Sequence, residues 1–390
     1  MYIDTMKDAM QIREEILANR RALHQIPEIG LELPQTVAFV TEKLEQMGIH
    51  YRVYRDCSCI TATIGKGGKC ILLRADMDAL PVAEQSGLCF ASTNGNMHAC
   101  GHDCHTAALL GAARILKAHE SELKGTVKLI FQAGEEIFKG ASAAIAHGVM
   151  EDPKVDAAFA THVFAAMPCG SVAYGKNTMA SVYGFRIRVQ GKGTHGSAPE
   201  MGIDPIAVGA NIVMALQEII AREIAPSQKA VLTIGHFEGG SAANIIPDYA
   251  ILEGTLRTFE RELRGYLLTR ITEVAESVAK AYRAAVTVET LSDVPSVVCD
   301  DAMTELTIRC AKAVKADVTL VPGLHTMGSE DFAFYGQQVP SVIVGIGAGV
   351  ADPAQWVGQH NPRILFHEDV LPLEAALYAK VAETWLEENP

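Results

Sequence analysis

The amino-acid sequence predicts an α/β fold with a mostly parallel central sheet, into which a second, smaller unit is inserted. Two observations lead to this prediction. Short apolar runs, typical of buried parallel strands, alternate with helical patterns in the first and last parts of the chain. Between these parts, the strands have one polar face instead. The 390 residues are 49% apolar, which is enough to form two domains.

The first part of the chain contains both kinds of element in alternation. Residues 35–47 are expected to form a helix that stops at Gly48, and residues 106–118 form a helix with one apolar face. Buried strands are expected at residues 70–74, 127–132, 157–161 and, near the end of the chain, 341–345. This alternation is typical of a sheet that is covered by helices.

The pattern changes near residue 181. Residues 183–190 alternate apolar and charged positions, so this strand has one face in water. The elements that follow are a helix at 205–222, strands at 230–237 and 250–258, a helix at 260–282 and a strand at 285–291. The order β-α-β-β-α-β is that of a ferredoxin-like unit. We therefore expect one domain from residues 1–180 and 295–390, with the insert at 181–294.

Charge and composition argue against several classes of partner. The net charge is −13, from 33 basic and 46 acidic residues, so we expect no nucleic-acid partner. No run of 18 apolar residues is present, so we expect no membrane span. The first 20 residues lack the apolar centre of a signal peptide, which favours a cytoplasmic protein. The nine cysteines have no framework spacing and should then be mostly reduced.

The strongest chemical signal is M-H-A-C-G-H-D-C-H-T at residues 97–106. Cysteine and histidine are preferred ligands of ions such as zinc. A single glycine separates Cys100 from His102 and lets the backbone fold so that both side chains face one ion. The alternative is a histidine-rich surface turn. We prefer a metal site because the turn opens a buried helix, a usual position for functional residues.

Two further signals lie at the ends of expected strands. Glu135 and Glu136 follow a buried strand, and adjacent side chains of an extended segment point apart. One carboxylate can therefore bind a metal while the other reaches a metal-bound water. A pair of glutamates alone usually marks a solvated helix start, but open α/β sheets bind ligands at this strand end. His162 also ends a strand, and His360 lies in a loop. Alone, either histidine would be structural.

Asp76 and Asp78 end another strand, in R-A-D-M-D-A-L-P. They are candidates for ligands or for groups that orient the ligand imidazoles, and Asp103 is a candidate for the orienting role. The segment G-K-G-T-H-G at 191–196 has the spacing of a dinucleotide fingerprint. We reject that function because the next helix begins about ten residues too late. A serine hydrolase is not expected either, because the G-x-S-x-G motif is missing.

Together, seven motifs resemble those of the metallopeptidase family of aminoacylases and carboxypeptidase G-type enzymes. Within it, the chain is similar to the branch of hippurate hydrolases, N-acetyl-diaminopimelate deacetylases and plant indole-acetyl-amino-acid hydrolases. The resemblance runs from about Arg20 to the C-terminus. The motifs are R-R-A-L-H-Q-I-P-E-I-G, L-L-R-A-D-M-D-A-L-P, M-H-A-C-G-H-D, Q-A-G-E-E, G-T-H-G-S-A-P, N-I-I-P-D and M-G-S-E-D-F.

The resemblance implies a zinc-peptidase-like catalytic domain that holds two divalent ions, which among relatives are zinc, manganese, cobalt or nickel. The implied ligands are Cys100, His102, Glu136, His162 and His360. Glu135 matches the general base. The wider family has a His-x-Asp motif where this chain has Asp76-Met77-Asp78, so the roles of the two aspartates stay open.

For the insert, the resemblance implies a lid and a dimer interface, and therefore a homodimer or higher homo-oligomer. His195 matches a residue that stabilises the oxyanion in its own or a partner's site. Asn244 and Arg257 match positions that hold the substrate carboxylate, for which a guanidinium is a natural bidentate partner. From the residues alone, a loop cap for His195 and a surface ion pair for Arg257 stay open.

The expected activity is metal-dependent hydrolysis of the amide bond of N-acyl amino acids, of the hippurate or N-acetyl type. An alternative is an N-acetyl-diaminopimelate deacetylase or a small-dipeptide carboxypeptidase. A two-metal phosphoesterase is disfavoured by the acidic charge and the missing phosphate-binding loop. A metal-binding or redox protein that uses Cys100 and Cys104 would not need Glu135 beside a ligand. The acyl group and the amino acid stay open.

Overall fold

The computed structural model describes residues 3–390, which divide into two compact units. The first unit consists of residues 3–178, 298–325 and 331–390. The second consists of residues 179–297 and 326–330. Two short strands, β7 (Asn177–Met179) and β14 (Val297–Val298), lie where the chain passes from one unit to the other.

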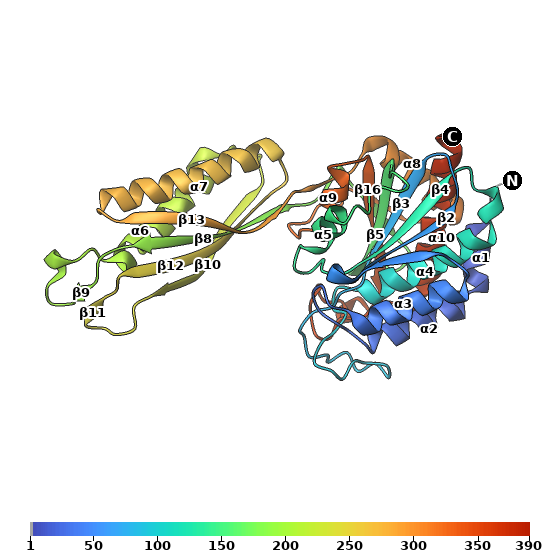
Figure 1. Ribbon diagram of the computed structural model, residues 1–390, viewed down its shortest axis with the longest axis horizontal. Helices are drawn as coiled ribbons and strands as arrows, with labels where there is room; N and C mark the ends of the chain where they lie inside the picture. Colours follow the sequence, from blue (N-terminus) through green and yellow to red (C-terminus); the bar gives the residue numbers. More distant parts are fainter. Residues whose placement is uncertain (1–2) are drawn as a thin grey trace. The chain divides into compact units, whose positions relative to one another are not determined.

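An eight-stranded sheet forms the centre of the first unit, in the order β1-β2-β4-β3-β5-β16-β6-β15 (Figure 1). Its strands are β1 (Tyr51–Tyr54), β2 (Cys59–Gly65), β3 (Cys70–Asp76), β4 (Thr126–Gln132), β5 (Ala157–Pro168), β6 (Val172–Tyr174), β15 (Leu320–Pro322) and β16 (Ser341–Gly349). The central neighbours β4, β3, β5 and β16 are parallel. Every residue of β3, β4 and β16 is buried, as expected for strands covered on both faces. The predicted α/β class is confirmed.

Helices cover both faces of this sheet (Figure 1). Helices α4 and α10 lie on one face, with α1 and α2 outside them and α3 beside α4 in contact with β2, while α5 and α9 pack on the other face. The helices are α1 (Thr5–Gln11), α2 (Arg13–His24), α3 (Pro34–Gln46), α4 (His102–Ala118), α5 (Gly140–Ala146), α8 (Asp301–Val314), α9 (Ala333–Gly336) and α10 (Leu371–Glu388). Helix α4 begins four residues earlier than the sequence pattern predicts.

The second unit is a four-stranded antiparallel sheet in the order β10-β12-β8-β13, with α6 and α7 on one face (Figure 1). Its elements are β8 (Ser181–Gln190), β9 (Thr194–His195), α6 (Pro205–Glu218), β10 (Ala230–Gly239), β11 (Ile245–Ile246), β12 (Tyr249–Thr258), α7 (Arg261–Ala281) and β13 (Ala285–Val294). The expected order β-α-β-β-α-β is therefore confirmed. Residues 205–223 are long and apolar enough to span a membrane, with a mean hydropathy of 1.2. In this structure their apolar side packs into the core of the unit, through Val208, Ile212 and Leu216.

Candidate functional site

The carboxyl ends of β3 and β4 lie side by side and are followed by acidic residues. Asp76, at the end of β3, is in register with Gln132, at the end of β4. Asp78 lies two residues beyond β3, and Glu135 lies three residues beyond β4. Both side chains are buried. Open α/β sheets bind ligands at this end of the strands, so these residues mark a candidate site.

All five residues proposed as metal ligands meet at this end of the sheet. Cys100 Sγ lies 3.5 Å from His162 Nε2. Glu136 Oε1 lies 3.9 Å from His102 Nε2 and 3.5 Å from His360 Nε2. The possible ligand atoms of Cys100, His102 and His162 lie within 4.8 Å of one another. The same holds for Cys100, Glu136 and His360.

The glycine between Cys100 and His102 is required by the local geometry. Gly101 has a φ of +92°, in the left-handed region, and it directly precedes helix α4. A Cβ at this position would lie 2.4 Å from Val163 Cγ2 and 3.1 Å from Phe366 Cζ. Gly101 therefore lets the chain turn sharply into the helix, so that residues on both sides of it face the same site.

Main-chain carbonyl groups fix the orientation of two imidazoles. His102 Nδ1 donates to the carbonyl oxygen of Asp78 at 2.8 Å, and His162 Nδ1 donates to that of Val163 at 2.9 Å. In both rings this leaves Nε2 directed into the site, as is usual for metal-binding histidines. The prediction that His162 ends a strand is wrong. Strand β5 continues to Pro168, because its later residues pair with β16.

Glu135 and Glu136 lie in a turn, so the prediction of an extended segment is wrong. The Asp78 carboxylate makes the difference, because it accepts the main-chain N–H groups of both glutamates at 3.0 Å each. These bonds fold the segment and let the two carboxylates face the same region. Possible ligand atoms of His102, Glu135 and Glu136 accordingly lie within 4.8 Å of one another. Asp78 thus holds the turn through its carboxylate, while its main-chain carbonyl orients the His102 ring and its Oδ1 lies 3.5 Å from His102 Nδ1.

Asp76 contacts His105, a histidine outside the predicted ligand set. Asp76 Oδ1 accepts from His105 Nδ1 at 2.5 Å, and His105 Nε2 accepts the N–H of Val163 at 2.8 Å. Both ring nitrogens of His105 are therefore used within the protein. Asp76 Oδ2 lies 3.6 Å from His102 Nε2. His102 and His105 are three residues apart and therefore share one face of α4. This spacing is the signal that could have indicated that His105 also faces the site.

Asp103 faces away from the predicted ligands. Its Oδ2 accepts from Arg20 Nε at 2.9 Å and contacts His24 Nδ1 at 2.8 Å, both on helix α2. Burial opposes protonation of His24, but the charge of Asp103 raises the pKa of His24 to about 9. The His24 ring also contacts Glu84 at 3.0 Å. Asp103 therefore joins α2 to the first turn of α4, instead of orienting a ligand imidazole.

The loop that carries His360 is fixed above the site by its own backbone and by one amide. The His360 N–H donates to the carbonyl oxygen of Ala99 at 2.9 Å. Gln359 Nε2 donates to the carbonyl oxygens of Cys100 and Val163 at 3.1 Å each. His360 has a φ of +68°, a conformation that costs free energy for a residue with a side chain and is found mainly at functional sites.

The electrostatics of the site fit bound cations. Burial raises the pKa of the Cys100 thiol well above its ordinary value, which disfavours the thiolate, and raises the pKa of Glu136 to about 7. Within the described residues, His102 Nε2 and Glu136 Oε1 are buried without a hydrogen-bond partner. Such an atom typically costs about 1–3 kcal/mol. Divalent ions with sulfur, nitrogen and oxygen ligands would satisfy both atoms and stabilise a thiolate.

The other predicted site residues lie in the second unit. His195 is exposed on β9 and pairs with Ile245 of β11, while the N–H of Gly196 donates to the carbonyl oxygen of Asn244 at 2.7 Å. His195 and Asn244 are therefore presented together at one end of this unit. The alternative of a loop cap for His195 has some support, because His195 Nδ1 lies 2.7 Å from Ser197 Oγ.

Arg257 is half-buried on β12 and binds the segment 326–330. Its Nη1 donates to the carbonyl oxygen of Met327 at 2.8 Å and to Ser329 Oγ at 3.1 Å. Burial lowers the pKa of Arg257. These bonds help to explain why residues 326–330 belong to the second unit, which the sequence pattern did not show. Both printed bonds are made by Nη1 of the guanidinium.

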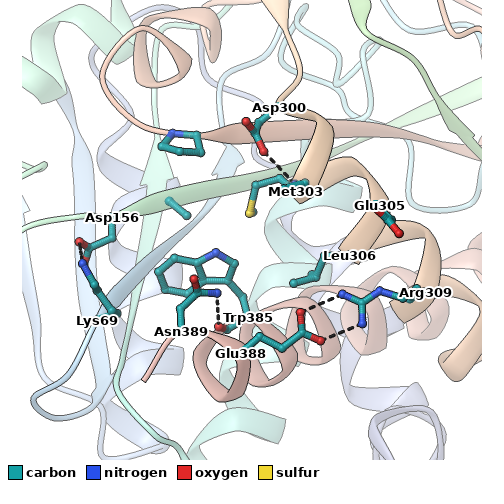
Figure 2. A pocket seen from close by; sticks show the side chains of 13 residues that line it. Lys69, Asp156, Asp300, Met303, Glu305, Leu306, Arg309, Trp385, Glu388 and Asn389 are labelled. Atoms are coloured by element: carbon teal, nitrogen blue, oxygen red, sulfur yellow. Dashed lines mark hydrogen bonds and ion pairs between the residues drawn. The ribbon is translucent and has the colours of Figure 1, made fainter.

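A separate cavity of about 590 Å³ lies at the opposite, amino end of the strands (Figure 2). It is lined by residues that precede or begin β3, β5 and β16, and by α8 and α10. Figure 2 shows its basic side chains paired within the wall: Lys69 Nζ binds Asp156 at 2.9 Å, and Arg309 forms two bonds of 2.8 Å with Glu388. No predicted site residue lines this cavity.

Known proteins match this chain over nearly its whole length. The model of peptidase family M20/M25/M40 matches residues 72–384. An N-acetyl-L-cysteine deacetylase of Bacillus subtilis is 36% identical, over 97% of this chain and 90% of its own. The IAA-amino acid hydrolase ILR1-like 4 of Arabidopsis thaliana is 36% identical, over 94% of this chain and 84% of its own. A dinuclear metal binding peptidase of the M20 family from Bacillus subtilis has a TM-score of 0.84 and 33% identity, over 97% and 99% of the two chains.

Proposed function

The chain belongs to peptidase family M20/M25/M40 and is an amidohydrolase, and we propose that it hydrolyses the amide bond of N-acyl amino acids of the hippurate or N-acetyl type. The products are a carboxylic acid and a free amino acid. The observation that carries this proposal is Glu135, a buried carboxylate that shares a cluster with His102 and Glu136. A protein that only binds metal would not need it. The names of the two relatives above both refer to an acyl group on the nitrogen of an amino acid, which supports the substrate class.

The chain offers enough ligands for two divalent ions. They would be held by the set that meets at the carboxyl end of the sheet: Cys100, His102, Glu136, His162 and His360. When bound, such ions lower the pKa of water and polarise a carbonyl oxygen. Zinc, manganese, cobalt and nickel are all compatible with this mixture of ligands.

Glu135 is proposed as the general base. It removes a proton from the attacking water and returns it to the nitrogen of the leaving amino acid, which would otherwise leave as a poor anionic group. A carboxylate suits both steps if its position is fixed, and the turn around Glu135 is fixed by the N–H groups that Asp78 accepts. Burial of Glu135 also excludes bulk water from the reacting atoms.

Residues of the second unit are proposed to bind the substrate. Arg257 would hold the carboxylate of the amino acid with its guanidinium, and Asn244 would donate a further hydrogen bond. His195 would stabilise the oxyanion that forms from the acyl carbonyl, in its own site or in a partner's. Loss of such a donor typically lowers turnover about 10²–10³-fold.

We also propose that the protein forms a homodimer through the second unit. Large apolar side chains are exposed on this unit, among them Met214 at 70%, Ile245 at 53% and Phe237 at 40%. Large apolar side chains exposed on the monomer are candidates for burial in an interface. A Met214→Glu variant should then sediment as a monomer, and an unchanged sedimentation coefficient would count against this interface.

Cytoplasmic localisation is likewise proposed, and the nine free cysteines are consistent with a reducing compartment.

A panel of substrates tests the proposed reaction. Purified protein loaded with zinc or manganese would be assayed with hippurate, N-acetyl-L-cysteine, an N-acetyl-diaminopimelate, a dipeptide and a phosphate ester. We expect cleavage of at least one N-acyl amino acid and none of the phosphate ester. The Glu135→Gln variant should keep its metal but lose turnover by about 10²–10⁴-fold. Glu151→Gln, which changes an exposed glutamate elsewhere, is the matched control. Wild-type turnover by Glu135→Gln would contradict the assignment of the base.

A further inference from the structure

The segment that carries Glu135 and Glu136 is held at both ends by one buried aspartate far away in the sequence. Asp331 precedes α9 and is fully buried. Its carboxylate accepts from Gln132 Nε2 at 2.8 and 2.9 Å, and from the main-chain N–H of Ala141 at 2.8 Å. Residue 132 ends β4 and residue 141 lies in the first turn of α5. The same carboxylate therefore fixes the points where the turn leaves the sheet and enters the helix.

Asp331 also contacts the proposed base itself. Its main-chain N–H donates to Glu135 Oε1 at 3.4 Å. The turn between the two anchored ends is closed tightly, because the N–H groups of Lys139 and Gly140 both donate to the carbonyl oxygen of Gly134. A Cβ at Gly140 would lie 1.8 Å from the carbonyl oxygen of Ala133. With its ends anchored and its middle closed, the segment has little freedom to move Glu135.

A buried arginine supplies the opposite charge. Arg74 Nη2 donates to Asp331 Oδ1 at 2.9 Å, and Arg74 Nη1 donates to Asp76 Oδ2 at 2.6 Å. Arg74 Nε contacts Gln132 Oε1 at 3.2 Å. All four side chains are fully buried. A buried charge is costly unless it has a partner of opposite charge. Arg74 is that partner both for Asp331, which contacts Glu135, and for Asp76, which lies beside His102.

We propose that Asp331, neutralised by Arg74, is a positioning residue that holds the carboxylate of Glu135 in place for proton transfer. This inference rests on the proposed function, because it takes Glu135 as the general base. Misplacement of a reacting group by about 1 Å can lower turnover about 10²-fold. The effect of losing the Asp331 carboxylate should therefore appear in kcat, whereas KM and metal binding depend on other residues.

The test compares Asp331→Asn and Asp331→Ala with the wild-type enzyme. In one orientation the asparagine oxygen accepts from Arg74 and Gln132, and its N–H₂ group then faces the N–H of Ala141. In the flipped orientation the oxygen accepts from Ala141, and the N–H₂ group then faces the guanidinium of Arg74. We expect kcat to fall about 10-fold for Asp331→Asn and about 10²-fold for Asp331→Ala. KM should change less than about twofold, and the metal content per folded chain should equal that of the wild type.

A crystal structure of Asp331→Asn gives a second readout that does not depend on activity. We expect the Glu135 side chain to be displaced or to occupy more than one conformer. Asp156→Asn is the matched control, because Asp156 also accepts a main-chain N–H, from Cys70, and pairs with a cation, but at the amino end of β3 (Figure 2). That variant should retain wild-type kcat and an unmoved Glu135.

Two results would overturn the inference. One is wild-type kcat together with an unmoved Glu135 in Asp331→Asn. The other is a loss of activity that merely follows a loss of metal or of folded protein, since that would show a purely structural role. Failure of the proposed function is distinguished by Glu135→Gln in the same assay. If that variant kept full turnover, the base would be misassigned, while the crystal structure would still show whether Asp331 holds Glu135.

Discussion

The two ends of the central sheet differ in how their charges are balanced. At the amino end, Lys69 and Arg309 pair with carboxylates at the wall of an open cavity. At the carboxyl end, His102 Nε2 and Glu136 Oε1 are buried without a hydrogen-bond partner among the described residues. A folded protein seldom keeps buried polar atoms unpaired without a functional reason. The difference supports the carboxyl end as the proposed metal site, because its unpaired atoms are ones that a cation would bind.

Removal of metal should have the largest effect on activity, because the proposed ligands lie at the carboxyl end and the amino end has none of them. Dialysis against a chelator is expected to reduce amidohydrolase activity to background, because no other group in the site supplies the same activation of water. Addition of zinc or manganese should restore it. The melting temperature should rise with metal concentration, because ions that bind only the folded state stabilise it. Full activity in protein shown to be metal-free would show that the reaction needs no metal at the carboxyl end.

The Gly101→Ala variant should have the next largest effect. The methyl group would meet Val163 Cγ2 at 2.4 Å, in a left-handed conformation that alanine avoids. We expect a loss of about 3 kcal/mol in the free energy of unfolding, measured with urea, and a weaker affinity for metal. Gly48→Ala is the matched control, since Gly48 has a φ of +65° with nothing within 4 Å of the added atom. It should lose about 1 kcal/mol and keep its metal affinity.

His24 should make stability depend on pH. Its pKa is raised from 6.5 to about 9 in the folded protein, so the protonated ring stabilises the fold fully below pH 6.5. This contribution, roughly 3 kcal/mol, should be lost as the pH rises through about 9. The free energy of unfolding in urea, measured at pH 6 and at pH 9.5, checks this. The His24→Gln variant, measured in the same way, gives the part of the pH dependence that comes from all other titratable groups. An equal decrease in both proteins would show that His24 does not contribute.

Asp156→Asn should have the smallest effect. The ion pair with Lys69 is partly exposed, with side-chain exposures of 51% for the lysine and 27% for the aspartate. Such pairs are usually worth about 0–1 kcal/mol, and the asparagine oxygen can still accept the N–H of Cys70. We therefore expect less than about 1 kcal/mol of destabilisation by urea unfolding. A loss of turnover in the correctly folded variant would mean that the amino end also affects the reaction.

The fold class could be predicted from sequence because its signals are local, since buried strands appear as apolar runs. Of the five proposed ligands, Cys100, His102 and Glu136 lie in short recognisable motifs, whereas His162 and His360 were proposed only together with these motifs and the family resemblance. The supporting contacts could not be predicted in the same way. Arg74 and Asp331 are 257 positions apart, and nothing in either segment indicates its partner. Likewise, the turn at Glu135 depends on Asp78, which follows a different strand, so local sequence alone favoured an extended segment.

We propose that two cations bind at the carboxyl end of the sheet. Anomalous X-ray diffraction from crystals soaked in zinc or manganese tests it most directly. We predict two peaks, both within bonding distance of members of one set: Cys100, His102, Glu136, His162 and His360. Peaks elsewhere on the chain, or fully loaded crystals with no peak among these five side chains, would contradict this account.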